Sequence, residues 1–274
     1  MRFIFLGTGT SAGVPAIACD CATCTSSDPR DKRLRTGSAI CWTDATGQDR
    51  TVLIDTTPDL RQQALTHNLR RCDAVLFTHN HVDHVFGLDE VRRFNIAMQA
   101  PIDIYAEPHT MEALRRVFQH VFEAHNNVNK SFVATLIGHE IEPERPIDLF
   151  GLRFTPIRLL HGRLPILGFR IEPAPGSRIK ADFLPLAYCT DVSRIPSESY
   201  PKLADLNTLV LDCLRPRHHP THLTVDQAIT TADEIGAKRT WFVHMAHQVM
   251  HAEVDAQMPG ESMGLAWDGL VLGE

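Results

Sequence analysis

Four potential metal ligands lie within six residues of this chain, at His79, His81, Asp83 and His84. They follow an apolar run, Ala74–Phe77, that is typical of a buried strand. Side chains two apart in an extended chain point to the same side, so His79, His81 and Asp83 are expected to converge, while His84 opens a helix. Imidazole and carboxylate groups are suitable ligands for Zn²⁺, Mn²⁺ or Fe²⁺. Four such ligands are more than one tetrahedral catalytic site takes from a single loop. The cluster therefore predicts two metals.

Two adjacent divalent cations predict hydrolysis. Metals roughly 3.5–4 Å apart can hold a bridging hydroxide and stabilise charge on the attacked group. Such a hydroxide forms near neutral pH and replaces a serine or cysteine nucleophile. Asp83 is expected to ligate a metal and also to act in catalysis by orienting the hydroxide, and the sequence does not separate these two roles.

Three cysteines crowd into one early segment, at Cys19, Cys21 and Cys24. Their thiolates are of the kind that close a structural zinc site, which needs a fourth ligand. The alternative is three free thiols in a loop. The other cysteines stand alone in apolar surroundings and are expected in the core; these are Cys41, Cys72, Cys189 and Cys213.

The elements that must position these residues form a mixed α/β pattern. Thr224-x-x-Gln227 has the form of a capping box and marks the start of one helix. Two segments rich in polar residues and proline, 126–146 and 172–185, are expected to be loops or lids. The predicted strands cover 2–6, 38–42, 51–54, 74–77, 102–105, 152–157, 168–171, 208–211 and 240–243, and the predicted helices cover 59–68, 84–97, 110–124 and 224–235.

Composition restricts the class of protein. The chain has 274 residues, 43% of them hydrophobic and 22% charged, which is enough for one large core, and we expect a single domain over 1–274. A net charge of -6 argues against binding of long nucleic acids, whereas a small anionic substrate can still enter a cleft made positive by metals. The apolar run Phe3–Leu6 is too short for a signal peptide or a membrane span, so we expect a cytoplasmic protein with no membrane partner.

The motif His79-x-His81-x-Asp83-His84 after an apolar strand resembles the signature of the metallo-β-lactamase superfamily. The resemblance implies a four-layer αββα sandwich. It also implies that one metal takes the first two histidines with a distant third, that the other takes the Asp-His pair with a late histidine, and that a carboxylate bridges them. Residues at later strand ends resemble these remaining positions, namely His161 in LLHG, Asp191 in YCTDV and His244 in WFVHMAH.

A phosphodiesterase branch of this superfamily, similar to the phosphoribosyl cyclic phosphate phosphodiesterase of phosphonate breakdown, shares the Cys-x-Cys-x-x-Cys cluster with a late histidine. By this resemblance His247 is the fourth ligand of the structural zinc. His222, which precedes the predicted helix at Thr224, resembles the general acid of that branch, with a solvated loop histidine as the alternative. His218 and His219 lie in the same loop. The branch implies two catalytic Zn or Mn ions, one structural Zn, a small cyclic or sugar phosphate ester as substrate, and a homodimer.

Other functions stay open. The segments Arg35-Thr-Gly-Ser-Ala and Thr56-Thr-Pro-Asp-Leu-Arg also resemble pyrroloquinoline quinone biosynthesis protein B, a group that tends to lose the full histidine motif kept in this chain. Transfer RNA 3′ processing is disfavoured by the acidic balance and by the lack of a glycine-rich, basic arm. A metal-dependent carrier without turnover is the nonenzymatic alternative.

Overall fold

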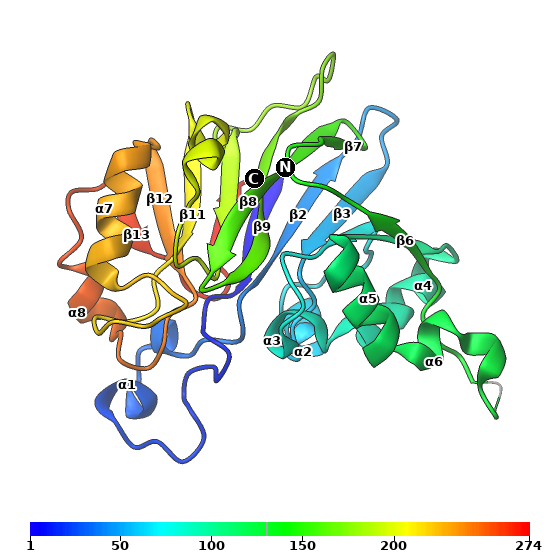
Figure 1. Cartoon of the computed structure of the whole chain (residues 1–274), viewed down its shortest axis with the longest axis horizontal. Coiled ribbons are helices and arrows are strands. Elements are labelled where there is room, and N and C mark those ends of the chain that lie inside the picture. Colours follow the sequence, from blue (N-terminus) through cyan, green and yellow to red (C-terminus); the bar gives the residue numbers. More distant parts are fainter. Residues whose placement is uncertain (130) are drawn as a thin grey trace.

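Two seven-stranded sheets face each other at the centre of the computed structural model, which describes residues 1–129 and 131–274 (Figure 1). The first sheet has the order β14-β1-β2-β3-β4-β5-β6. Within it, β3, β4, β5 and β6 run parallel, so their carboxyl ends lie at one edge. Its strands are β1 (Arg2–Gly7), β2 (Gly37–Thr43), β3 (Asp49–Ile54), β4 (Ala74–Leu76), β5 (Ile102–Ala106), β6 (Leu136–Glu140) and β14 (Val271–Gly273).

The second sheet has the order β13-β12-β11-β10-β9-β8-β7. Strands β10 to β13 are parallel, and β8 has the same direction as β10 because both are antiparallel to β9. The carboxyl ends of β8, β10, β11 and β12 therefore also share one edge. The strands are β7 (Ile147–Leu149), β8 (Leu152–His161), β9 (Leu164–Pro173), β10 (Leu186–Cys189), β11 (Thr208–Asp212), β12 (Arg239–Val243) and β13 (Met263–Leu265).

Helices cover the outer face of each sheet, which confirms the predicted α/β sandwich (Figure 1). Aromatic side chains that include Phe5, Phe154 and Tyr188 fill the space between the sheets and are fully buried. Burial of such side chains supplies most of the stabilisation of the sandwich. The helices are α1 (Ala22–Thr25), α2 (Leu60–Thr66), α3 (Val82–Val85), α4 (Arg92–Met98), α5 (Pro108–Val117), α6 (Gln119–Phe122), α7 (Val225–Ile235) and α8 (His251–Asp255), with 3-10 turns η1 (Pro29–Asp31), η2 (Leu88–Val91), η3 (Ala124–Asn126) and η4 (Ser197–Leu203).

The capping box predicted for α7 is present. The hydroxyl of Thr224 accepts a hydrogen bond from the Gln227 backbone N–H at 3.2 Å, and the side-chain oxygen Oε1 of Gln227 accepts one from the Thr224 backbone N–H at 3.0 Å. At the other end Gly236 adopts a left-handed φ of 67°, which terminates the helix. Both ends of α7 are therefore fixed by local sequence.

Three predicted elements differ from the structure. The expected helix over 110–124 is divided into α5, α6 and the start of η3. The expected helix over 84–97 is divided into α3, η2 and α4, because the chain at Gly87 packs so closely on Thr57 that an added Cβ would lie 2.0 Å from its carbonyl oxygen. The expected loop 126–146 contains the edge strand β6, whose largely exposed residues lack the apolar alternation of a half-buried strand. No helix in the described part of the chain is long and apolar enough to cross a membrane.

Candidate metal centre

The residues predicted to hold metals gather at the common edge of the two sheets. His79 follows β4, His161 ends β8, Asp191 follows β10 and His244 follows β12. Asp191 and His244 have left-handed φ values of 59° and 64°, which are uncommon for residues other than glycine. Such conformations turn the chain sharply at the strand end and concentrate at functional sites.

One group of donors consists of His79, His81 and His161, whose candidate ligand atoms lie within 4.8 Å of one another. Nδ1 of His79 lies 2.9 Å from the Thr78 hydroxyl, and Nδ1 of His161 lies 2.7 Å from the Thr221 carbonyl oxygen. Each contact occupies Nδ1 and leaves Nε2 for the centre. Burial lowers the pKa of all three histidines, so their rings are neutral and offer a lone pair.

A second group consists of Asp83, His84, Asp191 and His244, again within 4.8 Å. Nε2 of His84 lies 3.3 Å from both carboxylates, and Nε2 of His244 lies 3.1 Å from Asp191. The expected convergence of Asp83 with His79 and His81 is wrong. Helix α3 begins at Val82 and directs Asp83 toward the second group, because the extended geometry ends at His81.

The donor chemistry fits divalent cations. Among the described residues, the buried Nε2 atoms of His79, His84 and His244 have no hydrogen-bond partner. Burial opposes charge on His84, yet Asp191 and Asp83 raise its pKa well above the ordinary value. Two carboxylates and several neutral imidazoles that converge in a buried space require positive charge, which a divalent cation supplies.

A carboxylate outside both groups fixes one of these rings, and the prediction from sequence missed its role. Oδ2 of Asp55 lies 2.7 Å from Nδ1 of His84, and the same carboxylate accepts hydrogen bonds from the backbone and hydroxyl of Thr78. Burial raises the pKa of Asp55, against the opposing effect of His84. The sequence signal for Asp55 is a carboxylate directly after β3. Because β3 is parallel to β4, the carboxyl ends of the two strands lie at the same edge of the sheet.

His222 lies at the rim of the same centre. Its ring stacks on that of His244 with centroids 4.7 Å apart, and its Nδ1 lies 2.9 Å from Oδ1 of Asp212. The other oxygen of Asp212 accepts a hydrogen bond from the Leu223 backbone at 3.0 Å, which holds the carboxylate in place. Sequence reasoning assigned no role to Asp212. The pair leaves Nε2 of His222 available to a substrate.

Cys19, Cys21 and Cys24 converge on His247, as the sequence predicted. Their sulfur atoms lie 3.1, 3.5 and 3.6 Å from Nδ1 of His247. Sulfur and nitrogen ligands of a tetrahedral zinc lie about 3.6 Å apart, from the usual bond lengths. Hydrogen bonding from the Cys24 backbone lowers the pKa of Cys21 to about 6, whereas burial raises that of Cys24 to about 11. The four donors fit a structural zinc.

The two sites share one short segment, since His244 and His247 are three residues apart. The guanidinium of Arg33, which is 1% exposed, lies beneath this segment. It donates hydrogen bonds to the carbonyl oxygens of Ala246 and Val249 at 3.4 and 2.8 Å and pairs with Asp31 at 3.1 Å. A buried, multiply bonded cation of this kind restricts movement of the segment.

Comparison with known proteins identifies the family and the fold. The family described as beta-lactamase superfamily domain matches residues 50–245. A solved structure of a diphosphatase from the PhnP family is 38% identical, with a TM-score of 0.86 over 100% of this chain and 97% of that one. Zinc-bound PqqB from Methylobacterium extorquens has the same fold, with 21% identity and a TM-score of 0.78 over the whole of both chains.

A sequence relative carries a different name. An octanoyltransferase of Porphyromonas gingivalis is 37% identical over 255 residues, which are 92% of this chain. The matched residues make up 48% of the relative, so the chain spans about half the length of that protein.

Proposed function

We propose that this chain, which belongs to the β-lactamase superfamily, is a metal-dependent phosphodiesterase. Its proposed substrate is a small cyclic or sugar phosphate ester. The observation that carries the proposal is the pair of donor groups at the common sheet edge, with His222 beside them. The likeness to a diphosphatase at 38% identity over nearly the full length of both chains supports hydrolysis of a phosphorus–oxygen bond.

Each donor group has a separate task. His79, His81 and His161 would hold one divalent cation, and Asp83, His84, Asp191 and His244 the other, with Asp191 between them. Zn²⁺ and Mn²⁺ both suit these donors. When bound, such cations polarise phosphate oxygens and lower the pKa of water near them. Asp55 and Thr78 keep the rings of His84 and His79 in one orientation, so the site is formed before substrate enters.

His222 is proposed as the general acid. The carboxylate of Asp212 accepts from Nδ1 of His222, so the ring presents Nε2 to the leaving oxygen and donates a proton there. The contact with Asp212 holds the imidazole in this orientation. Water adds to phosphorus as the bond from phosphorus to the leaving oxygen breaks, that oxygen takes the proton from His222, and the proton lost by the water restores the protonated ring. An acyclic ester gives a phosphate monoester and an alcohol, whereas a cyclic ester gives one ring-opened monoester.

A second candidate is a role like that of PqqB, in cofactor biosynthesis or as a carrier. Its support is the fold that the chain shares with zinc-bound PqqB. The full His79 to His84 motif favours turnover over simple carriage. The octanoyltransferase name gives weaker guidance, because more than half of that relative lies outside the match.

The test combines metal analysis with turnover. Protein purified without chelator is assayed for zinc and manganese and for hydrolysis of bis-p-nitrophenyl phosphate, beside Asp191→Ala. The proposal expects about three metals per chain, metal-dependent turnover in the wild type, and loss of turnover in the variant because the bridge is removed. About three metals without turnover would favour the PqqB-like role, and one metal or none would overturn the dinuclear assignment.

A further inference from the structure

The loop that ends in His222 is basic, although the chain as a whole has a net charge of -6. Its residues 215–222 read Arg-Pro-Arg-His-His-Pro-Thr-His and include no carboxylate. Asp212 contacts this loop, but it is fully buried, and its two oxygens already bond to the ring of His222 and the backbone of Leu223. The basic loop therefore keeps the positive charge of its two arginines, and no step of the proposed mechanism uses that charge.

Hydrogen bonds restrain the basic loop and join it to the metal centre. The guanidinium of Arg215 donates to the carbonyl oxygens of Arg217 and His218 at 3.3 and 3.1 Å. The carbonyl oxygen of Thr221 lies 2.7 Å from Nδ1 of His161. The basic loop therefore has a fixed position relative to a predicted metal ligand.

Imidazole rings form a row that runs from the first donor group to the basic loop. The ring centroid of His161 lies 5.0 Å from that of His81 and 4.6 Å from that of His222. The ring of His219 comes next, with its centroid 5.1 Å from that of His222. His219 thus lies directly beyond the proposed general acid. A group attached to a leaving oxygen at His222 is therefore within reach of His219.

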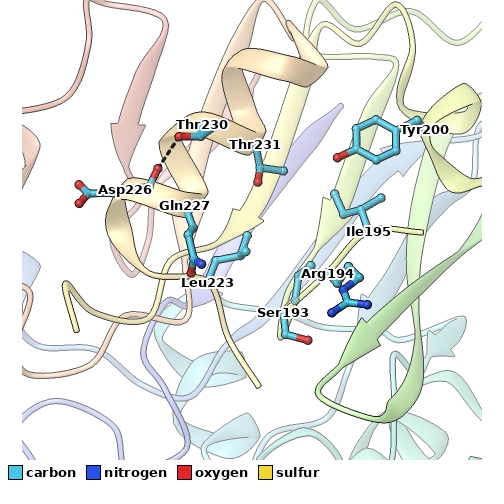
Figure 2. A pocket seen from close by; sticks show the side chains of 10 residues that line it. Ser193, Arg194, Ile195, Tyr200, Leu223, Asp226, Gln227, Thr230 and Thr231 are labelled. Atoms are coloured by element: carbon cyan, nitrogen blue, oxygen red, sulfur yellow. Dashed lines mark hydrogen bonds between the residues drawn. The ribbon is translucent and has the colours of Figure 1, made fainter. Parts of the chain in front are cut away.

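After His222 the chain turns away from the basic loop into α7. Leu223, the next residue, lines a cavity of about 350 Å³ between α7 and η4 (Figure 2). The residues that line this cavity include no member of either donor group. We therefore expect the leaving portion of a substrate to lie along the basic loop, and not in this cavity.

One ring nitrogen of His219 remains as a hydrogen-bond donor. Its Nδ1 accepts from the Thr221 backbone N–H at 3.4 Å and lies 3.1 Å from the Thr221 hydroxyl. Because Nδ1 is the acceptor, Nε2 carries the hydrogen of the ring. The side chain is partly exposed, so a substrate can approach it. A donor on a basic loop favours an anion, because hydrogen bonds to charged acceptors are stronger than those between neutral groups.

We infer that Nε2 of His219 donates a hydrogen bond to an anionic group carried by the leaving portion of the substrate. The positive charge of Arg215, held on the same loop, attracts the same group. The inference rests on the proposed function and narrows its substrate class to esters of an alcohol that itself bears a phosphate or a carboxylate. A contact remote from the reacting bond can position that bond, which raises kcat/KM.

The first experiment compares two esters whose phenols have similar acidity, methyl 3-sulfophenyl phosphate and methyl 3-chlorophenyl phosphate. The sulfonate supplies the anionic group. The wild type is expected to prefer the sulfonated ester by about tenfold or more in kcat/KM, the usual effect of a hydrogen bond to a charged group. His219→Ala should remove most of this preference and change hydrolysis of the chlorinated ester little. His125→Ala removes an exposed imidazole from η3, outside the basic loop, and should keep the wild-type preference.

A binding measurement separates the anion site from the phosphodiesterase. Binding of 3-hydroxybenzenesulfonate to the metal-loaded protein, followed by NMR, needs no turnover and should be about tenfold weaker in His219→Ala. Weaker binding in the variant, without hydrolysis of either ester by the wild type, would support the anion site and overturn the phosphodiesterase.

Other outcomes would overturn the anion site. These are hydrolysis without preference for the sulfonated ester, a preference that survives in His219→Ala, and an equal loss of activity on both esters in that variant. Absence of hydrolysis together with binding that is undetectable, or unchanged in His219→Ala, would overturn both proposals.

Discussion

Oδ2 of Asp55 and Nδ1 of His84 lie 2.7 Å apart, although 29 residues separate them in the chain. Both groups are fully buried. The contact directs Nε2 of His84 toward Asp83 and Asp191, and it holds a negative charge behind a ring that is expected to bind a cation. A carboxylate behind a histidine ligand fixes the tautomer and increases the basicity of the ring.

Asp55→Asn should lower the affinity of the catalytic centre for zinc by about 10–100-fold, because the amide keeps the shape but removes the charge behind His84. Competition with a fluorescent zinc chelator measures this change. The control is Asp103→Asn, which alters a surface Asp–His pair of the same 2.7 Å length, with His139. Equal affinities in Asp55→Asn and wild type would contradict the role given to Asp55.

His222→Ala should reduce hydrolysis in a manner that depends on the leaving group. For an ester with an alkoxide leaving group the expected loss in kcat is about 10²–10⁴-fold, since the departing oxygen needs a proton. For p-nitrophenolate, which leaves without one, the loss should be far smaller. Rates over a series of leaving groups test this. His218→Ala in the same exposed loop serves as the matched control, and a uniform loss in His222→Ala would contradict general acid catalysis.

Cys21→Ser should remove one zinc per chain and lower the thermal unfolding midpoint by several degrees, because structural zinc binding contributes directly to folding. Cys41→Ser, a half-buried cysteine outside the cluster, should change neither quantity. Elemental analysis and thermal unfolding give the two readouts. A Cys21→Ser protein with unchanged zinc and midpoint would show that the cysteine cluster is not a zinc site.

His251→Phe should make stability less dependent on pH. The ring of His251 is fully buried and neither nitrogen has a partner among the described residues, and burial lowers its pKa from 6.5 to about 4. Below pH 6.5 His251 binds a proton in the unfolded chain but not in the folded chain. The contribution of His251 to the free energy of unfolding is therefore complete above pH 6.5 and is lost as the pH falls toward 4. Between pH 7.5 and 5 the loss is about 2 kcal/mol.

Urea denaturation at these two pH values measures that difference. Phenylalanine keeps the ring contact with Trp267 and cannot take up a proton. The free energy of unfolding of the variant should therefore fall about 2 kcal/mol less than that of the wild type. An equal fall in both proteins would mean that His251 is not the source of the acid sensitivity.

The short motif from His79 to His84 determined a large part of this assignment, because four metal-type ligands in six residues have few other uses. The cysteine cluster was equally informative, since three thiols within six residues can reach one ion in many local conformations. His161, Asp191 and His244 were identified through the resemblance to the superfamily, from their order along the chain and their positions after apolar runs. The metal-ligand motif and the cysteine cluster depend only on residue types at short spacings along the chain, so the sequence alone reveals them.

The family resemblance implied how the ligands are divided, whereas strand spacing by itself grouped Asp83 with His79 and His81, and the tertiary structure decided between the two. Asp83 belongs with Asp191 and His244 because α3 starts at Val82 and ends the extended geometry at His81. The roles of Asp55 and Asp212 required the register of parallel strands, which brings strand ends from distant parts of the chain to one edge. The sequence specifies the chemistry of each side chain, whereas the distances between side chains that are remote in the sequence are set only when the two sheets pack.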